Sequence, residues 1–234
     1  MGGSTHREIL LVPHLFRASN IDSAARATEL LQDAGIAVRL LEQEQMDVIE
    51  TNPVLCGLSR AASNGDAAAG CELVLVLGGD GTFLRAAGFA RAQDIPVLGI
   101  NLGHVGFLAE GEAASLEKVI GQVIDRSYRV VERMTLDIAV IGEHGDVLGR
   151  GWALNECSIE NSDRSRVLDA TLEVDFRPVS SFGCDGVLIS TPTGSTAYAF
   201  SAGGPVMWPQ LDAILVVPNN AHALFAKPLV VAPT

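Results

Sequence analysis

The chain has 234 residues, of which 48% are hydrophobic and 19% are charged, and its formal net charge is −12. No apolar run approaches the roughly 18 to 20 residues that a membrane-spanning helix needs, and an acidic surface opposes broad contact with nucleic-acid phosphates. We therefore expect a cytoplasmic protein of one large or two modest domains, with neither a membrane nor a nucleic-acid partner.

The first half of the chain alternates short apolar runs with stretches of helical periodicity. This alternation is typical of a parallel sheet covered by helices. Residues 42–70 are rich in small residues and indicate an irregular connection, and the pattern leaves its helix content open. The predicted strands are residues 8–12, 37–41, 72–77 and 96–100, and the predicted helices are 24–34, 83–92 and 116–124.

From about residue 130 the pattern changes to the period of two that is typical of half-buried strands. The run 135–160 indicates two strands joined around His144, Gly145 and Asp146. We therefore predict an α/β domain with a parallel sheet over residues 1–128, followed by a β-rich, sandwich-like domain over residues 129–234.

The four cysteines, Cys56, Cys71, Cys157 and Cys184, lie far apart in the sequence and form no C-x-x-C pair. Neither a zinc site nor a disulfide framework is predicted, and no residue is assigned as a metal ligand. In so acidic a chain, an anionic ligand would need helix N-termini, a few arginines or a divalent cation.

A glycine-rich loop, GGDGT, follows the apolar run LVLVL, and an apolar helical pattern resumes after it. The carboxyl edge of a parallel strand faces the ligand crevice of an open α/β sheet, and glycines let backbone N–H groups approach a phosphate there. Asp80 would repel a phosphate unless it holds a metal ion or accepts a proton from a hydroxyl nucleophile. The alternative is that Asp80 only caps the helix. Arg85 is either a phosphate partner or an exposed helix residue.

Two commoner phosphate motifs, G-x-x-x-x-G-K-[ST] and G-x-G-x-x-G after a strand, are absent. A Walker-type nucleotidase and an ordinary dehydrogenase are therefore not predicted. The next predicted strand runs into a second loop, NLGHVGFLAE, residues 101–110. Phe107 in that loop either stacks on a purine or belongs to the core.

The segment DGVLISTPTGSTAYAFSAGGP, residues 185–205, is unusually rich in hydroxyl side chains. The ribose and amide edges of a nucleotide would use such groups, whereas in an ordinary capped turn they would bond to the backbone. Asn155 and Glu156 interrupt an apolar pattern further upstream. They either hydrogen-bond ribose or adenine groups or face solvent at a sheet edge.

Together, GGDGTFLRA, NLGHVGFLAE, LNE and the segment 185–205 resemble the NAD kinase family in its actinobacterial form, from about Glu72 to Lys227. Loops like GGDGT also occur in diacylglycerol-kinase-like lipid kinases and in phosphofructokinases, and the segment 185–205 distinguishes the chain from them. The resemblance implies transfer of a phosphoryl group from ATP, or from polyphosphate, to the adenosine-ribose 2′-hydroxyl of NAD. It also implies Mg²⁺ or another divalent cation, and a homo-oligomer, either a dimer or a tetramer.

Carried over position by position, the resemblance makes Asp80 the general base that deprotonates the 2′-hydroxyl. Asn155 and Glu156 would hold the adenosine end of NAD, and Asp185 would face the nicotinamide side. The other nucleotide contacts that the resemblance implies are Gly79, Gly81, Arg85, Phe107, Arg166, Thr196, Ala197, Tyr198 and Ser201.

Family members continue through further strands after the last apolar run, PLVV, so the resemblance implies that the second domain is cut short here. Two alternatives therefore stand beside the kinase. One is a catalytically impaired NAD- or NADP-binding fragment. The other is a lipid kinase, which predicts an apolar groove for acyl chains and leaves the hydroxyl-rich segment 185–205 unexplained.

Overall fold

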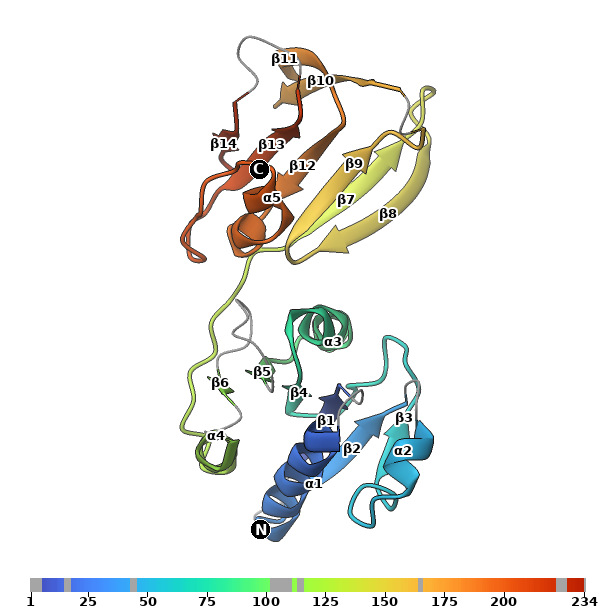
Figure 1. Cartoon of the computed structure of the whole chain (residues 1–234), viewed down its shortest axis with the longest axis vertical. Coiled ribbons are helices and arrows are strands. Elements are labelled where there is room, and N and C mark those ends of the chain that lie inside the picture. The colour runs from blue at the N-terminus through green and yellow to red at the C-terminus, as the bar shows by residue number, and fades with distance from the viewer. Residues whose placement is uncertain are drawn as a thin grey trace, which may run out of the picture. The chain divides into compact units, whose positions relative to one another are not determined.

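The computed structural model describes residues 6–14, 18–42, 46–101, 111–112, 116–163, 166–221 and 227–233. Internal contacts divide the chain into two compact units, Met1–Val130 and Val131–Thr234 (Figure 1). Within the described ranges, no helix has both the length and the apolar character needed to cross a membrane.

The first unit is built on a six-stranded parallel sheet in the order β3-β2-β1-β4-β5-β6. Its strands are β1 (Glu8–Pro13), β2 (Ala37–Leu41), β3 (Ser59–Ala61), β4 (Leu73–Leu77), β5 (Val97–Asn101) and β6 (Gly111–Glu112). The helices are α1 (Ala18–Asp33), α2 (Met46–Glu50), α3 (Asp80–Gln93) and α4 (Leu116–Ile124).

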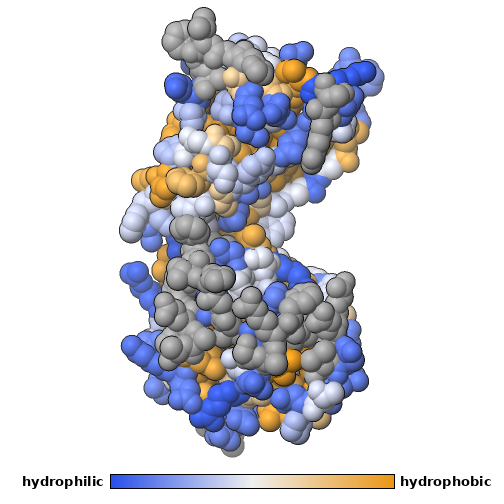
Figure 2. Space-filling model, in the orientation of Figure 1, coloured by the Kyte–Doolittle hydropathy of each residue, from blue (hydrophilic) through white to orange (hydrophobic). Residues whose placement is uncertain are grey.

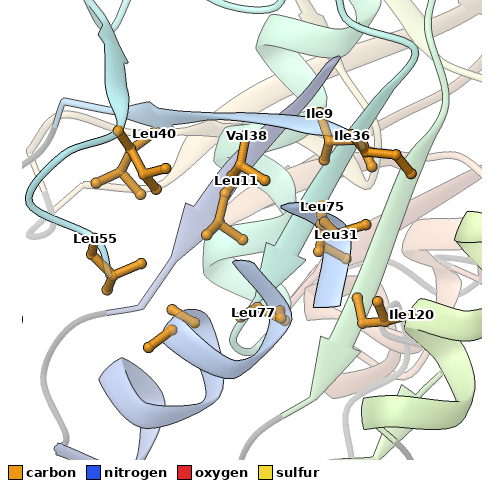
Figure 3. Packing of buried hydrophobic residues seen from close by; sticks show 14 of the residues in the cluster. Ile9, Leu11, Leu31, Ile36, Val38, Leu40, Leu55, Leu75, Leu77 and Ile120 are labelled. Atoms are coloured by element: carbon orange, nitrogen blue, oxygen red, sulfur yellow. The ribbon is translucent and has the colours of Figure 1, made fainter. Parts of the chain in front are cut away.

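Successive residues of the central strands enter two separate cores, because side chains alternate between the faces of a sheet. Ile9 and Leu11 of β1 pack with residues of α1 and α4 (Figure 3). Leu10 and Val12 pack on the other face with small residues of α3, such as Ala86. The central strands are therefore covered on both sides, which explains why β4 is a continuous apolar run with every residue buried.

An ion-pair cluster joins the start of the sheet to the end of α4. Arg7 Nη2 lies 2.6 Å from Glu72 Oε1, and Arg7 Nη1 donates to the carbonyl oxygen of Ile124 at 2.8 Å. Arg126 Nη2 binds the other carboxylate oxygen of Glu72 at 2.9 Å. The hydrogen bonds from Arg7, followed by those from Arg126, hold the pKa of Glu72 below its usual value against the opposing effect of burial.

The second unit is made of antiparallel strands. Four of them form a sheet in the order β14-β13-β12-β9, while β7 pairs with β8 and β10 pairs with β11. The strands are β7 (Leu136–Ile141), β8 (Val147–Ala153), β9 (Glu156–Glu160), β10 (Leu168–Val174), β11 (Arg177–Cys184), β12 (Gly186–Ser190), β13 (Ile214–Asn219) and β14 (Leu229–Val231). A 3₁₀ turn (Thr193–Thr196) and the short helix α5 (Tyr198–Ser201) follow β12.

The predicted fold class, a parallel α/β domain followed by a β-rich domain, is confirmed, and three local expectations need correction. Helix α1 begins at Ala18 and not at residue 24, and residues 42–70, whose helix content the pattern leaves open, contain the strand β3 in addition to the helix α2. Tertiary burial explains the second difference, since Ile49 and Leu55 enter the main core although the surrounding sequence shows no clear period. The run 135–160 forms three strands and not two, because β9 separates from β8 and pairs with β12.

Candidate functional site

The GGDGT loop connects β4 to α3 at the carboxyl edge of the parallel sheet. The N–H of Gly78 donates to the carbonyl oxygen of Ile100 at 3.0 Å, which ties the loop to β5. Gly79 is the N-cap of α3 and makes no side-chain capping bond, and Asp80 is the first helical residue. Asp80 is therefore not the cap that the alternative interpretation required. Gly79, as the N-cap residue, has no side chain to cap α3, and a helix N-terminus that begins at a glycine lets a phosphate approach its backbone.

The end of β1 packs directly on this loop. A Cβ at Gly78 would lie 2.9 Å from His14 Cβ and 3.0 Å from Thr82 Oγ1, so only glycine fits without displacing a neighbour. The side chain of Asn20 donates to the carbonyl oxygen of His14 at 2.7 Å, and its own buried Oδ1 has no partner within the described part of the chain. Neither His14 nor Asn20 belongs to a phosphate-binding motif, so their place beside this loop could not be predicted from the sequence.

Asp80 and Arg85 lie on the same helix, the first half-buried and the second exposed. Gly81 is exposed in the first turn between them. Phe107 lies outside the described residues. Over those residues, no group of three or more His, Cys, Asp or Glu side chains could hold a metal ion.

In the second unit, several hydroxyls of the segment 185–205 serve the backbone. Thr191 Oγ1 donates to the carbonyl oxygen of Leu154 at 2.6 Å and accepts the N–H of Gly194 at 3.0 Å. The buried Ser195 hydroxyl accepts the N–H of Met207 at 2.8 Å. The hydroxyls of Thr191 and Ser195 therefore bond to the backbone, as in an ordinary capped turn. They hold the segment as a turn against the loop that precedes β9.

Three buried polar atoms of this turn and loop have no hydrogen-bond partner among the described residues: Asn155 Oδ1, Glu156 Oε2 and Thr193 Oγ1. The three residues are neighbours in space. Gly194, which follows Thr193, lies so close to Asn155 that a Cβ at this glycine would overlap the carbonyl oxygen of Asn155. Asn155 and Glu156 are partly buried, so they are not the solvent-facing edge residues of the alternative interpretation. Thr193 is not among the predicted site residues, because its place in the hydroxyl-rich segment is its only signal in the sequence.

The Glu156 carboxyl group is held in a poorly solvated place. Burial raises its pKa above the usual value, and a hydrogen bond from the backbone N–H of Tyr198 opposes the increase. A buried polar atom without a partner costs free energy unless a ligand or water satisfies it. The cluster formed by Asn155, Glu156 and Thr193 can therefore bind the hydroxyl or amino groups of a polar ligand.

Most of the remaining candidate residues of this unit lie on the 3₁₀ turn, on α5 and just before β12. Thr196 and Ala197 are half-buried at the end of the 3₁₀ turn, and Ser201 is exposed at the end of α5. Asp185 is exposed between β11 and β12, where its Oδ2 accepts a hydrogen bond from Asn220 Nδ2 at 2.8 Å. The Tyr198 hydroxyl accepts one from Asn219 Nδ2 at 3.3 Å.

Arg166 lies in the loop between β9 and β10. Its side chain is 80% exposed, and its guanidinium pairs with Asp163 at 3.3 Å. None of the contacts described for Arg166 joins it to the cluster around Glu156, so its predicted role in nucleotide binding has no support from the described contacts.

Two family models match the chain. The model described as the ATP-NAD kinase N-terminal domain matches residues 9–128, and the one described as the ATP-NAD kinase C-terminal domain matches residues 154–234. An NAD kinase of Corynebacterium efficiens is 68% identical over 233 residues, which cover 100% of this chain and 73% of that protein. An NAD kinase of Corynebacterium diphtheriae is 64% identical over 97% of this chain and 72% of its own length.

Two solved structures are also similar. An NAD kinase from Archaeoglobus fulgidus in complex with ATP has a TM-score of 0.69 and 25% identity, covering 97% of this chain and 77% of that one. Yeast NADH kinase complexed with NADH has a TM-score of 0.84 over 97% of this chain and 70% of that one. At 23% identity, the second likeness concerns the fold alone.

Proposed function

Because the chain belongs to the NAD kinase family, we propose that its two units bind different parts of the reactants. The enzyme transfers a phosphoryl group from ATP to NAD and thereby forms NADP, and membership of this family excludes the lipid-kinase alternative. In our proposal the GGDGT edge of residues 1–128 positions the transferred phosphate. The β-rich part, residues 129–234, holds the dinucleotide.

The observation that carries this assignment is the cluster of unpaired buried atoms on Asn155, Glu156 and Thr193. A carboxylate oxygen accepts hydrogen bonds from ribose hydroxyls, while an amide oxygen and a threonine hydroxyl can accept from an adenine amino group. The adenosine part of NAD offers both kinds of donor. Binding it would satisfy atoms that have no partner among the described residues, which favours an adenosine-binding role for this cluster.

Asp80 acts as the general base in this proposal. Its carboxylate accepts the proton of the adenosine-ribose 2′-hydroxyl as that oxygen forms a bond to the γ-phosphorus of ATP. The bond between the γ-phosphorus and the bridging oxygen breaks, and ADP leaves. Gly79, Gly81 and the first N–H groups of α3 bind the phosphate oxygens, with Arg85 as a further cation on the same helix. The position of Asp80 at the start of that helix supports this role.

Mg²⁺ accompanies ATP in the proposed reaction and offsets the negative charge of the phosphates. The lone Asp80 carboxylate of the described loop fits a cation that arrives with the nucleotide better than it fits a resident metal centre.

Inorganic polyphosphate is a second candidate donor of the phosphoryl group. Supplying each donor separately with Mg²⁺ and NAD, and quantifying NADP, distinguishes the two.

We also assign the enzyme to the cytoplasm and to a homo-oligomer, either a dimer or a tetramer. Figure 2 shows hydrophobic side chains at the surface of the second unit among hydrophilic ones. The β7–β8 hairpin also exposes large hydrophobic side chains, since Val140, Ile141, Val147 and Leu148 are all more than half exposed. Such a surface supports self-association, and light scattering on the purified chain measures its mass directly.

Thr193→Val tests the adenosine assignment, because it removes the unpaired hydroxyl with little change of shape. We expect NAD affinity, measured by calorimetry, to fall about threefold to tenfold, the range for one hydrogen bond, without loss of thermal stability. Thr171→Val is the matched control, since the Thr171 hydroxyl is exposed and bonds Ser181 on the β10–β11 hairpin. Unchanged NAD affinity in Thr193→Val would contradict the assignment.

A further inference from the structure

Two consecutive asparagines, Asn219 and Asn220, lie at the end of β13 and contact two candidate NAD-binding residues, Tyr198 and Asp185. Asn220 Nδ2 donates to Asp185 Oδ2 at 2.8 Å, and Asn219 Nδ2 donates to the Tyr198 hydroxyl at 3.3 Å. The backbone adds a third link, since the N–H of Asp185 donates to the carbonyl oxygen of Asn219 at 3.0 Å. One short segment therefore holds both side chains, although Asp185 and Tyr198 belong to different elements.

The backbone at this point suits asparagine for a physical reason. Asn220 has φ of 49°, in the left-handed region that asparagine tolerates better than most other residues. The residue follows directly after the β12–β13 pairing, in which Asn219 lies opposite Gly186. The turn out of the strand thereby brings the amide of Asn220 onto the carboxylate that precedes β12.

The chemistry of an amide differs from that of a basic side chain at the same place. A lysine or arginine would neutralise Asp185, whereas the Asn220 amide fixes one carboxylate oxygen and leaves the charge unchanged. Because the bond uses Oδ2, Oδ1 is available to accept from a hydroxyl or carboxamide N–H of a ligand. In the same way, the Tyr198 hydroxyl that accepts from Asn219 keeps its own proton for donation.

We propose that Asn219 and Asn220 are positioning residues for the dinucleotide, which hold Tyr198 and Asp185 in the orientation that binds the part of NAD beyond its adenosine. The inference rests on the proposed roles of Asp185 and Tyr198 in NAD binding. Neither asparagine touches the reacting atoms, so their effect falls on NAD binding and not on the chemical step.

Asn220→Gly tests the proposal, because glycine accepts the left-handed backbone and removes only the amide. We expect the KM for NAD to rise about threefold to tenfold, the range for one lost hydrogen bond, while kcat, the KM for ATP and the Tm change little. Asn220→Asp, of nearly the same shape, places a second carboxylate beside Asp185 and is expected to raise the KM for NAD further. Asn64→Gly, at an exposed asparagine in the first unit, is the control and should leave the KM for NAD unchanged.

A double-mutant cycle separates positioning from a general structural effect. In the Asp185→Ala background, Asn220→Gly should cause no further change in the KM for NAD, and Asn219→Ala should likewise have no further effect in Tyr198→Phe. If Asp185→Ala leaves the KM for NAD unchanged, the proposed function of Asp185 is wrong. If Asp185→Ala raises it but Asn220→Gly does not, or if the two effects simply add, the positioning role is wrong.

Discussion

The β10–β11 hairpin carries a large aromatic residue in a backbone conformation that favours glycine. Val174 pairs with Arg177, which leaves a two-residue turn, and both of its residues have positive φ, 51° at Asp175 and 61° at Phe176. Such turns prefer Asn-Gly or Asp-Gly. The Phe176 side chain makes almost no compensating contact, because it is 98% exposed. Phe176→Gly should therefore stabilise the protein.

The size of the gain follows from two opposing contributions. Left-handed backbone costs a residue with a Cβ roughly 1–2 kcal/mol, and glycine avoids that cost. The greater freedom of glycine in the unfolded chain offsets about 0.5–1 kcal/mol of the gain. We expect the free energy of unfolding to rise by about 0.5–1 kcal/mol, which corresponds to roughly 1–4 °C in Tm for a protein of this size.

Thermal and urea unfolding of the wild type, Phe176→Gly and Phe176→Ala measure this effect. Alanine removes the exposed ring but keeps the Cβ, so Phe176→Ala should stay within about 0.5 kcal/mol of the wild type. If Phe176→Gly is no more stable than Phe176→Ala, backbone strain at the turn is not the cause and the reasoning is refuted.

Two carboxyl groups give pH-dependent predictions of opposite sign. Glu156→Gln replaces a partly buried carboxylate, and burial raises the pKa of that carboxylate. Because the folded state binds the proton more tightly than the unfolded state does, the stability of the wild type falls as the pH rises through the folded-state pKa. At pH 7 the Glu156→Gln variant should be more stable than the wild type by about 1 kcal/mol, and it should have a higher KM for NAD. An equally large gain in stability at pH 4 would show that burial of the ionised carboxylate is not the cause. Glu72→Gln removes a carboxylate, and hydrogen bonds from Arg7 and Arg126 lower the pKa of that carboxylate. The ionised Glu72 therefore stabilises the folded protein above its unfolded-state pKa, and this stabilisation is lost as the pH falls through the folded-state pKa. Urea unfolding should show the wild type more stable than Glu72→Gln at pH 7, with the difference shrinking toward pH 3 and not growing.

The first unit could be predicted largely from the sequence, because its strands are short apolar runs and its helices have a clear period. The exceptions are segments whose order comes from tertiary burial, as at Ile49, or from pairing with a distant strand, as in β9. Local pattern carries little information about either. The first turns of α1 were also missed, since they contain few apolar residues in register.

In the candidate site, the position of the glycine-rich loop could be predicted from its motif, whereas the hydrogen-bond partners of the hydroxyl-rich segment depend on the folded chain. The loop carrying Asp80 was predicted at the correct edge of the sheet, but which hydroxyls of residues 185–205 serve the backbone could not be read from their spacing. Thr191 and Ser195 bond carbonyl and N–H groups that are close only in the folded chain. Thr193, from the same segment, is left unpaired for reasons that only the three-dimensional packing reveals.

The catalytic role of Asp80 is decided by incubating the 234-residue chain and its Asp80→Asn variant separately with NAD and MgATP and quantifying the NADP formed. We expect the wild type to form NADP, and Asp80→Asn to form it more slowly by a factor on the order of 10² to 10⁴, as expected for a positioned base, while calorimetry shows NAD affinity retained. NADP formation by Asp80→Asn at the wild-type rate would contradict the catalytic role of Asp80. A wild-type chain that binds NAD but forms no NADP would instead favour the binding-only alternative.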